Sequence, residues 1–145
     1  MDADESLKLS HQLCFPIYAL ARQIIKAYTP YLQELGLTYT QYVVMMVLWE
    51  HQLINIKELG NKLYLDSGTL TPVVQKMEKS GLLIKRRSMT DQRQVEVQLT
   101  EQGLALKQKA YKVPAQMACK VGLKEEEIGK LYELTYKLLS DLTKN

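Results

Sequence analysis

Two cysteines are the residues of this chain whose side chains could carry covalent chemistry. They are Cys14 and Cys119, and the 145 residues contain no others. A thiol reacts with peroxides as its thiolate, which a helix N-terminus and nearby hydroxyl donors stabilise. Because Pro16 is tolerated best in the first turn of a helix, we expect a helix to open between Gln12 and Phe15. Cys14 then lies at a helix N-terminus, although spacing alone favours a buried, inert cysteine there and allows an inert core or surface thiol at Cys119.

Other kinds of chemistry have few candidate residues. The sequence shows no Gly-rich phosphate loop and no Ser/His/Asp set. His11 precedes Cys14 by three residues, but the other histidine is His51 and no acidic cluster completes a metal site. We therefore expect no metal, no cofactor and no enzymatic turnover. The rival from another class is a cysteine peroxidase that uses both thiols.

Length and composition favour one domain that spans residues 1–145. A chain with 46% apolar residues can bury a single core, and it is short for two ordinary domains. No window reaches the roughly 18 uninterrupted apolar residues of a membrane span, and the acidic start, Met1 to Glu5, differs from a signal peptide. We expect a cytoplasmic protein with reduced thiols and no membrane contact.

The hydrophobic pattern predicts helices, then a hairpin, then helices. Pro30 should help to end the first helix, and Pro72 fits the third short helix only if its regular part begins near Thr69. Four later helices are predicted from their caps: one after Thr38, one from Asn55 to Leu63, one from Asp66-Ser67 to Ser80, and one from Thr100 to about Val121. The last predicted helix runs from Lys124 to Leu142. Between them, Leu82–Arg87 and Val95–Leu99 alternate as two strands.

Two short capped helices followed by a basic hairpin indicate a winged helix-turn-helix that binds duplex DNA. From Lys76 to Arg93 the chain carries six basic and two acidic side chains, net +4, against +3 for the whole chain. The fold class is therefore mainly α, with a two-stranded β wing and a helical dimerisation region. Residues 38–99 would bind DNA, while 1–35 and 101–145 would form a homodimer across a two-fold axis. The candidate DNA contacts are Ser67, Thr69, Thr71, Gln75 and Lys76 on the second helix and Arg86, Asp91 and Arg93 on the wing.

Several motifs resemble the multiple-antibiotic-resistance regulator (MarR) family over nearly the whole chain. They are Leu59-Gly60, the block from Leu65 to Pro72, the Asp91-Gln92-Arg93 wing and Leu99 to Gly103. Within that family, the chain is similar to the organic hydroperoxide resistance regulators (OhrR) at Gln12 to Phe15, Tyr18, Tyr28, Thr38-Tyr39 and Leu48-Trp49-Glu50.

This resemblance implies a repressor that an organic hydroperoxide releases from an AT-rich inverted-repeat operator. It implies that Cys14 is oxidised to a sulfenic acid and that Tyr28 and Tyr39 hydrogen-bond its sulfur across the dimer. Cys119 lies where some members carry a second cysteine, which implies a disulfide between Cys14 of one subunit and Cys119 of the other. One alternative keeps the fold but replaces oxidation by reversible binding of a phenolic ligand between the two lobes.

Overall fold

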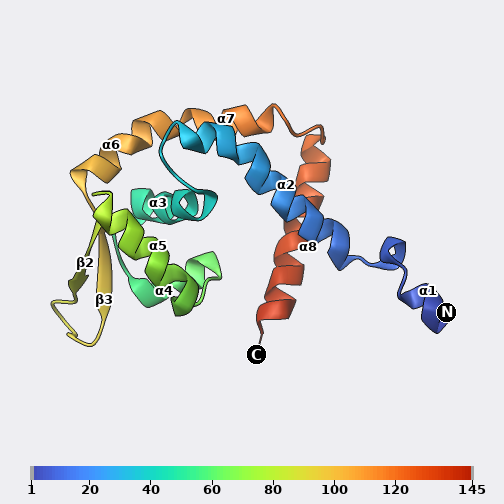
Figure 1. Ribbon diagram of the computed structural model, residues 1–145, viewed down its shortest axis with the longest axis horizontal. Coiled ribbons are helices and arrows are strands. Elements are labelled where there is room, and N and C mark those ends of the chain that lie inside the picture. Colours follow the sequence, from blue (N-terminus) through green and yellow to red (C-terminus); the bar gives the residue numbers. More distant parts are fainter. Residues whose placement is uncertain (1, 145) are drawn as a thin grey trace.

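The computed structural model describes residues 2–144, which form a winged head and a helical arm (Figure 1). The helices are α1 Ala3–Ser6, α2 Cys14–Gln33, α3 Tyr39–His51, α4 Ile56–Leu63, α5 Ser67–Lys79, α6 Glu101–Ala110, α7 Lys112–Ala118 and α8 Glu125–Thr143, with a 3-10 turn at Leu9–His11. The strands are β1 Leu53–Asn55, β2 Leu83–Arg87 and β3 Val95–Leu99. We call α3 to β3 the head and α1, α2 and α8 the arm. The predicted order of helices, hairpin and helices is confirmed.

The sheet has one strand more than the predicted hairpin. β3 lies in the centre and pairs antiparallel with β2 on one side and β1 on the other. Ile54 of β1 stands opposite Val97, and Lys85 of β2 stands opposite the same residue. The wing is therefore paired along both edges of β3, so it is joined to the end of α3 through β1.

The core of the head lies between α3, α5 and the sheet. Its fully buried side chains include Val44, Met45, Leu48, Leu59, Leu70, Val74, Met77, Leu83 and Val97. Trp49 closes this core toward α6, because its indole Nε1 donates a buried hydrogen bond of 2.9 Å to the carbonyl of Gly103. Burial of these apolar side chains, rather than helix propensity, stabilises the short helices of the head.

Helix α2 begins at Cys14, within the predicted window, but it ends later than predicted. Pro30 lies inside the helix, which continues to Gln33. The lost hydrogen bond at Pro30 is outweighed because the next turn places Leu32 in the core at 1% exposure. The stop is Gly36, whose φ of 69° lets Leu37 donate back to the carbonyl of Leu32 over 3.0 Å.

Helix α5 also begins earlier than its proline suggested. It starts at Ser67, so Pro72 is its sixth residue, and the expectation that regular helix begins near Thr69 is wrong. Asp66 determines the start, since its carboxylate accepts the Thr69 amide over 2.7 Å. Hydrogen bonds from Thr69 and Gly68 hold the pKa of the Asp66 carboxyl below its usual value, so the cap is charged at neutral pH.

The predicted helix from Thr100 to Val121 is interrupted. Tyr111 keeps helical dihedral angles between α6 and α7, but Pro114 has no N–H to donate to the carbonyl of Ala110. α7 ends at Ala118, with Cys119 as its C-cap, three residues before the predicted end. Together α6 and α7 form one bent rod, of which α7 lies against α2 and α6 extends toward the wing (Figure 1).

The arm exposes large apolar side chains. No residue of α8 is buried, and its exposed residues include Ile128, Leu131, Leu134 and Leu142. Leu13, the N-cap of α2, and Ile17, Tyr18, Leu20 and Ile25 within α2 are also exposed. Many exposed large apolar side chains on neighbouring elements are typical of an interface. Within residues 2–144, no helix is both long enough and apolar enough to pass through a bilayer.

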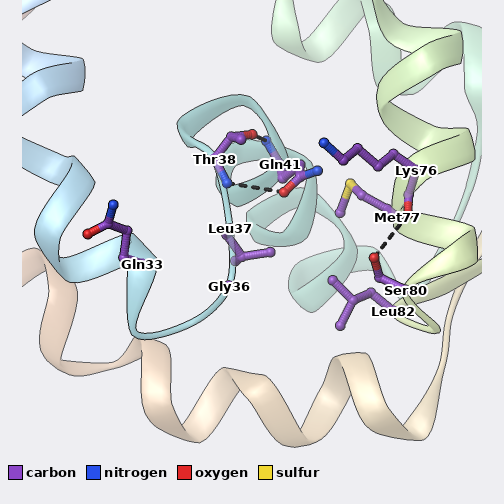
Figure 2. A pocket seen from close by; sticks show the side chains of 9 residues that line it. All are labelled: Gln33, Gly36, Leu37, Thr38, Gln41, Lys76, Met77, Ser80 and Leu82. Atoms are coloured by element: carbon purple, nitrogen blue, oxygen red, sulfur yellow. Dashed lines mark hydrogen bonds between the residues drawn. The ribbon is translucent and has the colours of Figure 1, made fainter.

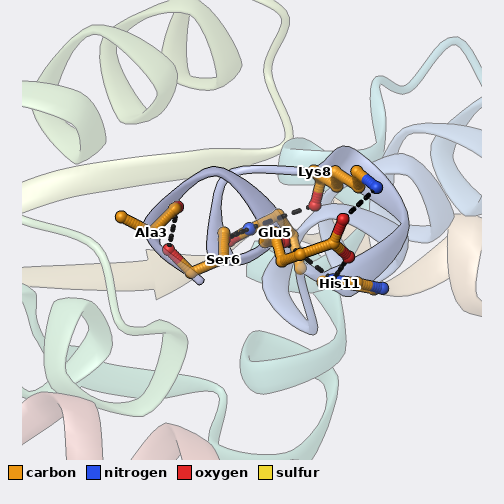
Figure 3. Close-up of polar contacts among 6 residues, drawn as sticks. Ala3, Glu5, Ser6, Lys8 and His11 are labelled. Carbon is orange, nitrogen blue, oxygen red and sulfur yellow. Dashed lines mark hydrogen bonds and ion pairs between the residues drawn. The ribbon is translucent and has the colours of Figure 1, made fainter. Parts of the chain in front are cut away.

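Before α2, the chain forms a small hook closed by its own polar groups (Figure 3). Ser6 donates its hydroxyl to the carbonyl of Ala3 over 2.7 Å, and Lys8 forms an ion pair with Glu5. His11 Nδ1 lies 2.7 Å from the carbonyl oxygen of Glu5. Because a carbonyl only accepts, Nδ1 carries the proton, so this histidine is oriented by the hook that precedes Cys14.

Candidate nucleic-acid interface and thiol sites

Helix α5 buries one face and presents the predicted contact residues on the other. Leu70, Val74 and Met77 are buried at 1% or less. The residues predicted to contact DNA lie outside this stripe: Ser67, Thr69, Gln75 and Lys76 are exposed, and Thr71 is half-buried. A helix with a polar face of this length and a capped N-terminus can enter the major groove.

The turn between α4 and α5 is closed by tight backbone contacts. Tyr64 ends α4 in the left-handed conformation, at φ 56°, and Leu65 donates to the carbonyl of Gly60 over 2.9 Å. A side chain at position 60 would meet the Leu65 carbonyl oxygen, since a Cβ there would lie 2.8 Å from it. Glycine at this position therefore sets the angle at which α5 leaves α4, and with it the direction of the polar face.

The two predicted wing arginines have different environments. Arg86 donates across the hairpin to Glu96 over 3.3 Å and to Gln98 over 3.2 Å, so its charge is shared within the protein. Arg93 has a side chain that is 95% exposed, and among residues 2–144 its only ion pair is a long one, 3.8 Å from Asp91. Asp91 itself accepts the amide of Arg93 over 3.0 Å, which fixes the turn. Of the two predicted wing arginines, Arg93 is thus the one whose charge is exposed to solvent.

Two polar residues that attach the wing to the helices were not predicted from the sequence. Glu78 on α5 accepts the backbone amide of Lys85 on β2 over 2.6 Å. Asn55 caps α4 by accepting the amide of Lys57, and it donates to Gln94 on the wing over 2.9 Å. The first contact spans seven residues and the second spans 39, and each joins two different elements. From the sequence, only a cap at Asn55 and a charge at Glu78 could be predicted.

Cys14 is the first residue of α2 and is exposed in the single chain. Its predicted partner Tyr28 follows it by 14 residues on the same helix. At 1.5 Å per residue, this spacing separates the two by about 21 Å. A single chain therefore does not bring the thiol to its predicted hydrogen-bond donors.

The structure does bring the two predicted tyrosines together. The rings of Tyr28 and Tyr39 lie 5.0 Å apart, and Tyr42 packs at 5.9 Å and 6.3 Å from them. Burial, followed by the neighbouring Tyr28, raises the pKa of Tyr39, and burial raises the pKa of Tyr42. A raised pKa favours the neutral phenol, so both hydroxyls remain hydrogen-bond donors well above neutral pH.

Cys119 lies at the Tyr28 end of α2 and away from Cys14. It caps α7, and the ammonium of the next residue, Lys120, lies 5.1 Å from the ring centroid of Tyr31. Tyr31 is one helical turn beyond Tyr28. The two thiols therefore flank α2 at opposite ends, and a disulfide within one chain would require α2 or α7 to move.

A pocket of about 310 Å³ lies between the end of α2, the start of α3 and α5 (Figure 2). Gln41 lies in its wall but is already used, because its side chain and amide form a capping box with Thr38. The Lys76 ammonium is the one charged group in the lining. The pocket joins the element that follows α2 to the helix with the predicted DNA contacts.

The part of the chain that the structure describes contains no cluster of metal-ligating side chains. Among residues 2–144, no group of three or more His, Cys, Asp or Glu side chains lies close enough to share an ion. His11 is oriented by the Glu5 carbonyl, as described above, and not by a second ligand.

Comparison with known proteins agrees with this geometry. Residues 26–110 match the family described as transcriptional regulator SarA/Rot. The organic hydroperoxide resistance transcriptional regulator of Bacillus subtilis is 42% identical over 138 residues, which cover 95% of this chain and 94% of that protein. Reduced AbfR bound to DNA matches with a TM-score of 0.80 at 29% identity, covering 99% of this chain and all of that one. Disulfide-formed AbfR matches with a TM-score of 0.67 at 30% identity, covering 97% and 96%.

The fold and these matches define a DNA-binding, winged-helix transcriptional regulator, which confirms the predicted fold class. The chain belongs to the SarA/Rot family of transcriptional regulators, among winged-helix proteins of the MarR type. The named members are regulators and not enzymes, so the alternative of a cysteine peroxidase is set aside.

Proposed function

We propose that this protein is a homodimeric repressor that an organic hydroperoxide releases from its operator through oxidation of Cys14. The observation that carries the proposal is the placement of the thiols: Cys14 opens α2 at one end, while Tyr28, Tyr39 and Cys119 gather at the other. In an antiparallel pair of α2 helices, the Cys14 end of each would meet the tyrosine end of its partner. Each Cys14 would then lie beside the Tyr28, Tyr39 and Cys119 side chains of the partner subunit.

The exposed apolar arm supports such a pair. No residue of α8 is fully buried within its own chain, and the apolar side chains of α2 near Cys14 are also exposed. Residues 1–35 and 101–145 would form the dimerisation region, and residues 38–99 would contact an AT-rich inverted repeat. Because an isologous interface repeats each contact, two thiol sites form per dimer. Because a repressor must reach its operator DNA, we expect the protein in the cytoplasm.

The proposed chemistry has two balanced steps. The Cys14 thiolate attacks the terminal oxygen of the hydroperoxide, the O–O bond breaks, and a sulfenic acid and an alcohol result. The Cys119 thiol of the partner subunit then attacks this sulfur, so that an S–S bond forms and water leaves. The names of two relatives support this course, since one is an organic hydroperoxide resistance regulator and AbfR has a disulfide-formed structure.

Subunit mixing tests whether the disulfide joins two chains. We expect Cys14→Ser and Cys119→Ser proteins, each treated alone with cumene hydroperoxide, to run as monomers on a non-reducing gel. After subunit exchange, a heterodimer carries one Cys14 and one Cys119 on opposite chains, so the mixture should give a covalent dimer. In the matched control, the Cys14→Ser, Cys119→Ser double variant replaces one of the two single variants in the mixture. A mixture without the dimer band, beside a wild type that forms it, would refute the intersubunit pairing.

Replacing the free arginine of the wing should separate DNA contacts by type. Because Arg93 is 95% exposed and shares little of its charge, Arg93→Ala should weaken operator binding and lower the salt slope by about one unit per subunit. Arg86 is paired with Glu96, so Arg86→Ala is the matched control and should change the slope less. Fluorescence anisotropy across a salt series measures both. Equal slopes for wild type and Arg93→Ala would remove Arg93 from the interface.

One observation favours a second candidate, a repressor released by a phenolic ligand. The pocket beside Thr38 connects the end of α2 to α5, and Lys76 could pair with an acidic ligand there. A ligand in this position would bias the angle of α5 without any oxidation. Under this candidate, release does not require Cys14, so the Cys14→Ser protein discriminates between the two functions.

A further inference from the structure

The tip of the wing exposes a large apolar side chain that the proposed interface has not used. Met89 is 88% exposed, the highest value among the large apolar residues of the described chain. The next most exposed, Leu7 at 82%, belongs to the N-terminal segment beside the arm. Met89 is far from that surface, at the bend between β2 and β3, so the dimer partner of the proposed function does not explain it.

The backbone around Met89 is held so that the side chain cannot fold back. The preceding Ser88 is 3% exposed, and its hydroxyl accepts the amides of Thr90 and Asp91, each over 3.3 Å. The Ser88 amide in turn donates to the carbonyl of Gln94 over 2.9 Å. A turn stabilised on both sides presents Met89 outward as a fixed feature.

Cations surround this apolar side chain on the wing. Arg87 precedes it by two residues and donates to the carbonyl of Gln92 over 3.1 Å, which places a guanidinium across the loop. Arg93 extends from the opposite side of the same loop. Cationic flanks attract phosphates, while an apolar centre suits the deoxyribose walls and base edges between them. Proteins that bind the minor groove insert apolar side chains, methionine among them.

We propose that Met89 is an apolar DNA contact, carried by the wing into the minor groove between the phosphates that Arg87 and Arg93 approach. This proposal rests on the proposed function, because only a DNA-bound wing would place Met89 there. It adds a contact that is independent of salt to a wing whose other contacts are electrostatic. A·T pairs under the wing should be preferred, because the guanine amino group would occupy the groove floor.

The test compares Met89→Leu, Met89→Gln and Met89→Ala with wild type on a short duplex that the wild-type protein has selected from a randomised pool. We expect Gln and Ala to weaken binding by roughly tenfold, as loss of one buried apolar side chain implies, while Leu remains close to wild type. The salt slope should not change, because no charge is lost. Thermal midpoints should also be equal, since the side chain contacts solvent in the free protein.

Base substitution locates the contact. Replacing A·T pairs under the wing by inosine·C pairs keeps the minor groove free of the amino group, so the difference between Met89 and Gln should persist, whereas G·C pairs should abolish it. Equal affinity of wild type, Met89→Gln and Met89→Ala would overturn the proposal, as would a changed salt slope. If Arg93→Ala lowers the slope while the Met89 variants bind like wild type, only this inference fails. If the wild type selects no duplex at all, the proposed function fails with it.

Discussion

Replacing Gly103 by alanine is expected to destabilise the protein more than any other single methyl group added to it. A Cβ at this position would lie 2.2 Å from the backbone oxygen of Leu82 and 2.7 Å from Leu99 Cδ1. The backbone oxygen cannot move aside without disturbing β2, so the cost should reach about 3 kcal/mol or more. Since domains are stable by only about 5–15 kcal/mol, the thermal midpoint should fall by roughly 10 °C in calorimetry or circular dichroism.

Gly122→Ala is the matched control for this prediction. Nothing lies within 4 Å of a Cβ at position 122, and the backbone there is not left-handed, so the midpoint should stay level or rise slightly. An unchanged midpoint for Gly103→Ala would contradict the close approach of α6 to the sheet. Loss of operator binding in parallel with unfolding would show that this contact holds the head to α6.

Replacing Cys14 by serine is expected to abolish release by hydroperoxide while leaving the reduced protein fully bound to DNA. A serine hydroxyl has nearly the size of the thiol but is not oxidised by a peroxide, so the first step of the proposed chemistry cannot occur. In an anisotropy titration with cumene hydroperoxide, the wild type should dissociate near stoichiometry. The Cys14→Ser protein should remain bound at more than a hundred equivalents.

Cys119→Ser is the informative comparison. The sulfenic acid can still form in that protein, but no disulfide protects it. Excess hydroperoxide should therefore oxidise it further to a sulfinic acid, which dithiothreitol does not reduce. Release of Cys14→Ser at the same peroxide concentration as wild type would exclude thiol sensing. The pocket beside Thr38 would then become the place to look for an inducer.

The sequence predicted the elements whose boundaries are set by local hydrogen bonds. Thr38 and Asn55 cap the helices where expected, and Pro16 correctly placed Cys14 at the start of α2. It failed where distant contacts decide. Pro30 did not end α2, because Leu32 beyond it is buried in the core. The break at Pro114 is a local effect that the predicted helix from Thr100 to about Val121 overlooked, because a proline there removes the hydrogen bond that Ala110 would accept.

The third strand shows the same limit. β1 has only three residues, with one buried side chain, Ile54. It is therefore too short to show the alternation of apolar and polar residues that predicts a strand. It exists because β3 offers a free edge and Leu99 donates to the carbonyl of Gln52 over 2.8 Å. For the candidate site, residue types could be read in advance, but the pairing of Arg86 with Glu96 and the freedom of Arg93 could not. Those depend on cross-strand register.

The central position of β3 has a consequence for how the protein measures DNA. Because β1, Glu78 and Asn55 attach the wing to the helices, we expect the head to move as one piece. In the proposed dimer, two such heads would hold their DNA-contacting α5 helices at a fixed distance from each other. Each added base pair lengthens an operator by about 3.4 Å and rotates one half-site relative to the other. A fixed distance between the two α5 helices would not fit inverted repeats whose half-site centres are shifted by a single base pair. The spacing between half-sites would then discriminate among promoters as strongly as their sequence.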